Sequence, residues 1–140
     1  MSSRTGGRIL VDQLRAHGVR QVFCVPGESY LAVLDALHES GIGTIVCRQE
    51  GGAAYMAEAA GKMTGQPGIV MVTRGPGATN ASGGIHVAAQ DSTPLLPHAG
   101  EIGLEHGSTR PVIVAVAIDD EHAASPSAIR EQLLLVGSYR

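Results

Sequence analysis

Residues 43–73 read GTIVCRQEGGAAYMAEAAGKMTGQPGIVMVT, and this stretch decides the fold. It begins with an apolar segment at 43–47 and ends with another at 68–73. Both segments are too apolar to alternate between a buried and a solvated face, so we expect strands covered on both faces. The alanine- and glycine-rich segment between them predicts a helix at 50–64. A strand, a helix and a strand in this order predict a parallel pair joined by a right-handed crossover.

The same alternation continues on both sides of this unit. The pattern predicts further strands at 21–25, 94–99 and 111–118, and further helices at 8–17, 30–39, 78–90 and 127–135. Thr5 is the expected cap of the first helix and Gly18 its stop, whereas Gly83 and Gly84 weaken the helix at 78–90. The segments between the apolar runs are too long for hairpin turns. We therefore predict an α/β fold, with a doubly wound parallel sheet and helices on both faces.

The composition narrows the class of protein. The chain has 140 residues, 44% of them hydrophobic, and a formal net charge of −3. These values predict one domain over 1–140 with a core of its own. The chain has no Lys/Arg cluster and few aromatic residues, which argues against a nucleic-acid partner. Residues 1–7 lack the apolar run of a signal peptide, and no stretch approaches the roughly 20 apolar residues of a membrane span.

The two cysteines, Cys24 and Cys47, lie inside apolar strand-like segments, where a reduced thiol packs as a small hydrophobic group. Two cysteines are too few for a disulfide scaffold, and their spacing fits no zinc site. The cysteine usage therefore predicts a reducing, cytoplasmic location.

In a doubly wound sheet, ligands bind beyond the carboxyl ends of the strands. Three loops occupy that position, 26–29 (PGES), 48–52 (RQEGG) and 74–80 (RGPGATN). The last of them departs from the dinucleotide-binding fingerprint, because Pro76 lacks an amide donor and no ribose-binding acid follows. The sequence contains neither a P-loop nor a nucleophile elbow, and we interpret Ser29 and Ser82 as caps or packing residues.

Glu50 is placed where a predicted strand ends and a predicted helix begins. Taken alone, a glutamate there complements the positive end of the helix dipole. The small residues that follow allow close approach of another backbone, while Glu58 and Lys62 predict an exposed i,i+4 ion pair. These small residues are Ala53, Ala54, Ala57, Ala60 and Gly61. The pattern therefore favours a position for Glu50 at an interface.

Four blocks of sequence, taken in order along the chain, carry a resemblance to a known family. They are Gly18-Val19 with VFCVPGESY at 22–30, RQEGGAAYMAEA at 48–59, TRGPGATN at 73–80 and QDSTP at 90–94. Over residues 8–103 the chain resembles the N-terminal, pyrimidine-binding domain of thiamine diphosphate enzymes related to acetolactate synthase. The resemblance implies thiamine diphosphate as cofactor and a small 2-oxo acid as substrate, for decarboxylation or carboligation.

The resemblance also implies roles for individual residues. The glutamate that matches Glu50 is catalytic: it hydrogen-bonds a ring nitrogen of the cofactor's aminopyrimidine and stabilises the imino tautomer, which removes the thiazolium proton. The other implied cofactor-binding residues are Gly27, Pro76 and Asn80.

Three further residues are weaker candidates, and each has an alternative interpretation. Glu28 falls where some decarboxylases of the family place an acid, but it is also an acid in the first turn of a helix. His86 is either a proton carrier or a core or interface residue. Glu101 replaces a glutamine of the family, which puts the role of that position near the substrate in doubt.

The chain departs from the family downstream of the fourth block. Residues 95–101 read LLPHAGE, where the family has an apolar strand. Pro97 removes a ladder donor, which argues against normal strand pairing. Residues 97–110 are irregular in pattern, and the predicted strand at 111–118 follows almost directly. We therefore expect a truncated domain that lacks one helix and one strand.

The sequence contains no Gly-Asp pair, whereas the family's diphosphate- and Mg²⁺-binding motif begins with one. The resemblance thus places Mg²⁺ on a separate domain or subunit, in a homo- or hetero-oligomer, with no metal on this chain. Alone, the chain is expected to bind the cofactor weakly at most. Three interpretations stay open: a fragment or subunit completed by a partner, a degenerate remnant without catalysis, and a non-enzymatic module that dimerises through its small-residue helices.

Overall fold

The structure, a computed structural model, describes residues 5–100 and 112–113. The elements follow in the order α1 (Gly6–Ala16), β1 (Gln21–Cys24), the 3-10 helix η1 (Glu28–Tyr30), α2 (Leu31–His38), β2 (Gly43–Val46), α3 (Glu50–Thr64), β3 (Gly68–Thr73), α4 (Pro76–Gln90), β4 (Leu95–Gly100) and β5 (Val112–Ile113). Thr5 caps α1 by accepting a hydrogen bond from the Arg8 amide, as predicted.

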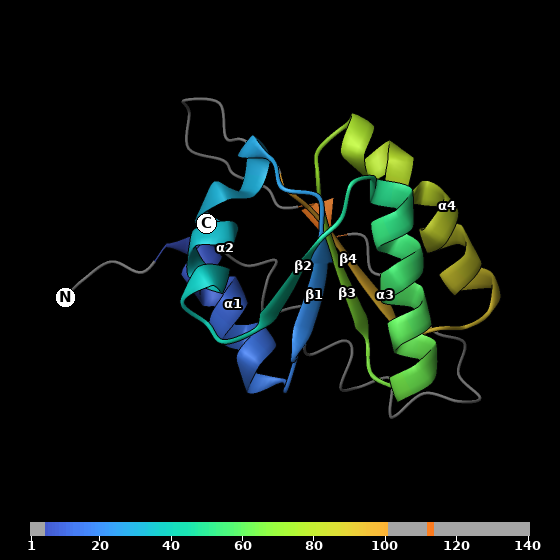
Figure 1. Ribbon diagram of the computed structural model, residues 1–140, viewed down its shortest axis with the longest axis horizontal. Helices are drawn as coiled ribbons and strands as arrows, with labels where there is room; N and C mark the ends of the chain where they lie inside the picture. The colour runs from blue at the N-terminus through green and yellow to red at the C-terminus, as the bar shows by residue number, and fades with distance from the viewer. Residues whose placement is uncertain (1–4, 101–111, 114–140) are drawn as a thin grey trace.

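The strands form one sheet in the order β2-β1-β3-β4-β5, and the pairs among β1 to β4 are all parallel. Helices α1 and α2 cover one face, and α3 and α4 cover the other (Figure 1). The predicted doubly wound α/β fold is thereby confirmed. From β1 the chain passes first to β2 on one side and then to β3 on the other, so the topological switch point lies between β1 and β3.

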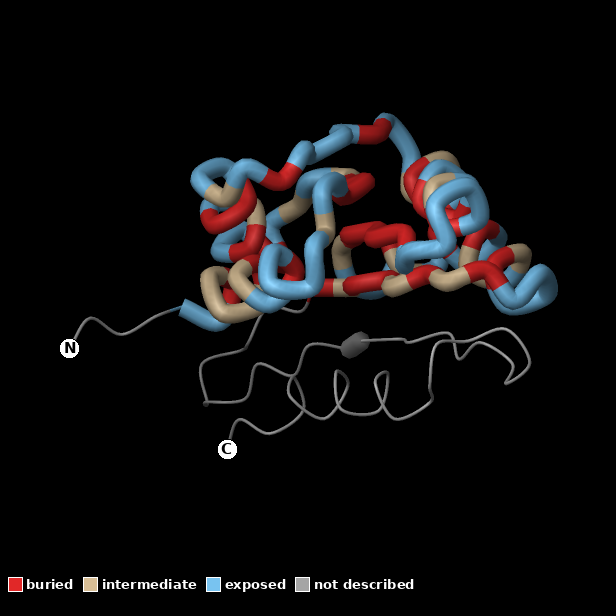
Figure 2. The backbone as a smooth tube through the Cα atoms, turned by 90° about the horizontal axis from the view of Figure 1, so that it is seen from below, coloured by how far each residue is buried: buried red, intermediate tan, exposed pale blue. Residues whose placement is uncertain are grey.

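The core has two layers, one on each face of the sheet. Ile69 and Met71 of β3 pack with α1 and α2, whereas Val70 and Val72 pack with α3 and α4. Figure 2 shows the buried segments along the central strands and on the inward-facing sides of the helices. Both cysteines are buried free thiols, as the sequence predicts.

Strand β2 differs from the prediction that the strands are covered on both faces. All four of its residues are exposed, and Val46 keeps 62% of its surface accessible. β2 is the outermost strand of the sheet, and the helices pack over the more central strands. The expectation of a buried strand at this position is therefore wrong for this chain.

Strand β4 forms despite Pro97, so the expectation of abnormal pairing is also wrong. It pairs with β3 along its whole length, from Gly68↔Leu95 to Thr73↔Gly100. The Gly68 amide donates to the Pro94 carbonyl. Successive amides of a strand point to opposite sides. In this register the amides of Leu96 and His98 face β3, so an amide at position 97 would face away from β3. Pro97 therefore removes no hydrogen bond between the two strands.

Helix α4 runs without a break through Gly83 and Gly84. A Cβ on Gly84 would lie 2.6 Å from the Ala54 Cβ of α3, so this glycine permits close packing of the two helices. The packing offsets the helix-propensity cost of a glycine, about 1 kcal/mol, that weakened the prediction.

The last predicted strand, 111–118, is described only as β5, which pairs antiparallel with β4. Parallel pairing at this position was a wrong expectation. A parallel crossover needs about a dozen residues or more, and only residues 101–111 separate the two strands. The predicted helix at 127–135 lies outside the described residues.

Candidate functional site

The loops that follow β1, β2 and β3 meet at one end of the sheet (Figure 1). A Cβ added to Gly27, after β1, would overlap the Thr73 Cγ2 atom at the end of β3. A Cβ added to Gly77, in the first turn of α4, would lie 2.5 Å from Thr73 Oγ1 and 3.6 Å from Glu50 Oε1. Gly27, Thr73, Gly77 and Glu50 therefore converge at the switch point, where doubly wound folds bind ligands.

Glu50 is the first residue of α3 and is half-buried. The helix is capped by its neighbour, since Gln49 Oε1 accepts a 2.7 Å hydrogen bond from the Gly52 amide. The Glu50 carboxylate instead meets α4, where Asn80 Nδ2 donates to Oε2 at 3.3 Å. No hydrogen-bond donor among the described residues reaches Oε1. This oxygen is thus free to accept an N–H group of a ligand.

Pro76 and Asn80 both lie in the first part of α4. Pro76 occupies the first helical position, where a missing amide costs nothing, and Gly75 precedes it with a φ of 59°. Pro76 adjoins Gly77, and Asn80 bonds Glu50. The structure therefore brings together the predicted residues Glu50, Gly27, Pro76 and Asn80.

We use the word crevice for the switch-point site around Gly27, Thr73, Gly77 and Glu50, because doubly wound folds bind ligands in a crevice at this end of the sheet. Glu28 follows Gly27 at the start of η1. Its carboxylate is exposed, and Arg74 Nη2 lies 3.7 Å from its Oε1 atom. The pair joins the loop after β1 to the loop after β3. A long, solvent-exposed ion pair of this kind contributes at most about 1 kcal/mol to stability.

Of the other two weaker candidates, the structure describes only His86, which lies away from the site. His86 is exposed on α4, about 15 Å along the helix axis from Pro76 at about 1.5 Å per residue. It is not a core residue of this chain either. Glu101 lies outside the described residues.

Two residues of the site, Thr73 and Tyr30, have roles that the sequence alone did not predict. Thr73 stands within a quoted block, but only the structure shows that both glycines abut it. The Tyr30 hydroxyl donates to the carbonyls of Val25 and Met71 and so joins η1 to β1 and β3. Burial raises the pKa of Tyr30, with Cys24 and Glu50 adding to the shift, so the hydroxyl keeps its proton. A hydroxyl side chain at a strand end, next to glycines, is the available sequence signal for Thr73.

The predicted close approach of α3 takes place within the chain. Ala53, Ala54, Ala57 and Gly61 are buried against α4, β3 and the segment before β4, and Ala60 is partly buried. Glu58 forms the predicted pair with Lys62, but it is buried rather than exposed. Glu58 is buried because its carboxylate also packs against Thr93, whose hydroxyl donates to Glu58 Oε1 at 3.1 Å.

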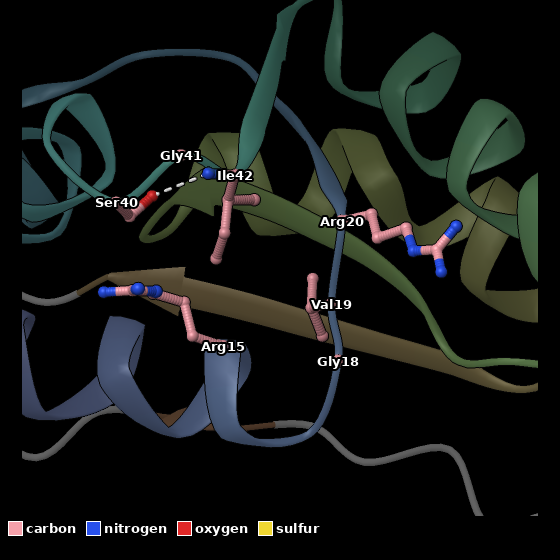
Figure 3. Close-up of a pocket in the computed structure, with 7 residues that line it drawn as sticks. All are labelled: Arg15, Gly18, Val19, Arg20, Ser40, Gly41 and Ile42. Atoms are coloured by element: carbon pink, nitrogen blue, oxygen red, sulfur yellow. Dashed lines mark hydrogen bonds between the residues drawn. The ribbon is translucent and has the colours of Figure 1, made fainter.

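A second hollow lies near the opposite end of the sheet, before β1 and β2. This pocket of about 320 Å³ is lined by Arg15, Gly18, Val19, Arg20, Ser40, Gly41 and Ile42 (Figure 3). The Arg20 side chain points away from Arg15 and Ser40, so the two guanidinium groups do not converge.

Residues 5–100 and 112–113 contain neither a metal-binding cluster nor a membrane-spanning helix. No group of three or more His, Cys, Asp and Glu side chains is placed to bind a metal ion. Within the same residues, no helix has the length and apolar character required to cross a membrane.

Comparisons of the sequence with a family model and with individual proteins point to the same family. Residues 4–123 match the family model described as thiamine pyrophosphate enzyme, N-terminal TPP binding domain. The acetolactate synthase of Bacillus subtilis is 44% identical over 97 residues, which cover 69% of this chain and 17% of that protein. The acetolactate synthase isozyme 3 large subunit of Escherichia coli is 34% identical over 153 residues, covering 100% of this chain and 27% of that protein.

The acetolactate synthase large subunit of Lactococcus lactis is 43% identical over 100 residues, covering 71% of this chain and 17% of that protein. The chain thus spans less than a third of the length of these relatives. The family match covers most of the chain, and its residues include all three loops of the crevice. The chain therefore belongs to the family of N-terminal TPP-binding domains of thiamine pyrophosphate enzymes, and it resembles the acetolactate synthases within it.

Proposed function

We propose that this chain forms the pyrimidine side of a thiamine diphosphate site that acts on 2-oxo acids, in decarboxylation or carboligation. The site is completed by a separate domain or subunit that binds the diphosphate and Mg²⁺. One observation carries the proposal: the half-buried Glu50 carboxylate faces the switch-point crevice with Oε2 held by Asn80 and Oε1 free.

The residues of the crevice fit an aminopyrimidine ring. Gly27 and Gly77 leave room for the Thr73 side chain, which packs against both of them and brings the loop after β1 close to the first turn of α4. Glu50 Oε1 supplies the acceptor for a ring N–H group, and the Asn80 amide fixes the orientation of the carboxylate. A charge-assisted hydrogen bond of this kind is stronger in a partly buried position than in open solvent.

When bound, thiamine diphosphate supplies the nucleophilic carbon and the electron sink for 2-oxo acid chemistry. The contribution of this chain is to bind and orient the pyrimidine and to hold a proton between Glu50 Oε1 and the ring nitrogen. A glutamine at position 50 keeps the shape of the side chain but removes the charge. It therefore separates the electrostatic role from packing.

The first experiment titrates ¹⁵N-labelled full chain with thiamine diphosphate and Mg²⁺ and follows the amide signals of Gly27, Gly51 and Gly77. We expect weak binding, on the order of a millimolar dissociation constant, and loss of most of it in Glu50→Gln. The matched control Asp35→Asn removes an exposed carboxylate from α2 and should bind as the unmodified chain does.

A comparison of ligands tests which half of the cofactor is recognised. Because the proposed contacts involve only the pyrimidine, thiamine without phosphates should bind the chain about as tightly as thiamine diphosphate. Inorganic pyrophosphate should leave the three glycine signals unchanged. Pyrophosphate binding in place of thiamine, or equal binding by Glu50→Gln, would contradict the proposal.

The family relation supports a partner. The Escherichia coli and Lactococcus lactis relatives are large subunits of acetolactate synthases, and this chain covers only a small part of each. The interpretation as a module that dimerises through its small-residue helices is less favoured, because those faces are already packed within the chain.

A further inference from the structure

Gly27 and Gly77 are glycines for a reason other than backbone conformation. Gly27 has φ −164° and ψ 164°, an extended conformation that any residue adopts. Gly77 is a helical residue of α4 and is not among the glycines with positive φ. Both positions would therefore accept alanine if only the backbone mattered. In both cases, the nearest atom that obstructs a Cβ belongs to Thr73.

Thr73 touches the two glycines with different branches of its side chain. The Cγ2 methyl group faces Gly27, and the Oγ1 atom faces Gly77. The side chain thus fills the space between the loop after β1 and the first turn of α4. A Cβ added to Gly77 would also lie 3.6 Å from Glu50 Oε1, so the first turn of α4 is close to the carboxylate. Thr73 therefore lies between the Gly27 loop and the part of α4 that adjoins Glu50.

We propose that Thr73 is a positioning residue, which sets the separation between the Gly27 loop and the Glu50 carboxylate and thereby the width of the pyrimidine crevice. The proposal rests on the proposed function, because the crevice has a ligand only if that function holds. A rigid ring held between two walls requires a fixed separation, and a displacement of about 1 Å can weaken a productive geometry about a hundredfold.

The test moves one methyl group from Thr73 to Gly27. Thr73→Ser removes the methyl that faces Gly27, and Gly27→Ala adds one that overlaps it. The double variant places the alanine methyl where the threonine methyl was. We expect each single change to weaken thiamine diphosphate binding about five- to tenfold, and the double variant to return to within about twofold of the unmodified chain.

Thr73→Val distinguishes spacing from a direct hydrogen bond to the ligand. Valine keeps both branches of the side chain and loses only the hydroxyl, so the spacing role predicts near-normal binding. If Thr73→Val lost binding while Thr73→Ser kept it, the hydroxyl would be the ligand contact and the spacing role would be wrong.

The readouts are the dissociation constant and the amide shifts of Gly51 and Gly77 in ¹⁵N-labelled full chain, at a temperature where every variant is folded. A purely structural role would change the melting temperature but not the affinity. The matched controls are Thr64→Ser at the far end of α3 and Gly83→Ala on the exposed side of α4, and both should bind normally.

The outcomes separate this inference from the proposed function. If the unmodified chain binds and Glu50→Gln does not, the proposed function stands. Normal affinity in Thr73→Ser and Gly27→Ala would then overturn the role of Thr73 alone. Additive losses in the double variant, with no recovery, would overturn it as well.

Discussion

Tyr30 joins three elements of the site through one hydroxyl group. This buried side chain lies at the end of η1 and donates to the carbonyls of Val25 and Met71. The two bonds hold the segment that contains Gly27 against β3. The position of that loop therefore depends on a group that lies behind the crevice.

Replacing Tyr30 by phenylalanine removes both hydrogen bonds and leaves the ring in place. We expect the free energy of unfolding to fall by about 1–2 kcal/mol, because the carbonyls of Val25 and Met71 lose the single O–H proton that they share. Urea unfolding followed by circular dichroism measures the change. Tyr55→Phe, at an exposed tyrosine of α3, should leave the midpoint unaltered, and equal effects of the two changes would contradict this explanation.

His98 is a second buried polar residue, on β4. The residue is 7% exposed, its ring packs edge-on against Tyr30 with the centroids 6.3 Å apart, and no hydrogen-bond partner for its Nδ1 atom lies among the described residues. Burial lowers the pKa of His98 below its ordinary value of 6.5. Between the lowered pKa and 6.5, the unfolded chain therefore binds more protons at this position than the folded chain.

The sign of the pH effect follows from this difference. The contribution of the neutral His98 to the free energy of unfolding is complete above pH 6.5. It is lost as the pH falls from 6.5 through the lowered pKa, and the loss is at most about 1.4 kcal/mol per pH unit. Urea unfolding at about pH 7.5 and about pH 5.5 tests it. His98→Leu should lose less stability between the two pH values, and an identical loss in both proteins would assign the effect to other groups.

At the scale of elements, the contact between α3 and α4 supports both Glu50 and Asn80. Gly84 makes this contact possible, since a Cβ there would lie 2.6 Å from the Ala54 Cβ and 2.8 Å from backbone atoms of α3. Gly83 precedes it on the exposed side, where a Cβ would meet the Tyr55 hydroxyl at an ordinary 3.4 Å.

Alanine substitutions at these adjacent glycines should have opposite effects. Gly84→Ala forces the helices apart and should lower the free energy of unfolding by about 1–3 kcal/mol. Gly83→Ala raises helix propensity and should be neutral or stabilising by up to about 1 kcal/mol. Thermal unfolding of the two variants is the measurement. A loss of similar size in both would mean that backbone flexibility, not the packing of α3, explains the glycines.

The elements themselves were predictable where their signals are local. Glu50–Thr64 and Gly68–Thr73 have the bounds that the pattern gives, because a cap, a glycine stop and an apolar run are each visible in the sequence. The pairing of β4 was not predictable from Pro97 alone. Whether a missing amide matters depends on which side of the strand it faces, and only the register with β3 decides that.

At the scale of the whole molecule, the sequence predicted the doubly wound fold and the end of the sheet where the loops meet. The convergence of Glu50, Gly27 and Asn80 was expected from the resemblance to the family. The exposure of β2 and the burial of Glu58 were not predictable, because both depend on neighbours distant in sequence. The position of Thr73 between Gly27 and Gly77 was not predictable either, because Gly27 and Thr73 are distant in sequence.

The central place of β1 in the sheet affects how the protein is made. β1 leaves the ribosome before β2 and β3, yet it lies between them in the sheet. A nascent chain that has not yet released residue 73 leaves one edge of β1 without its partner. Such an open edge can pair with another chain, so the interval before β3 emerges is when chaperone protection matters most.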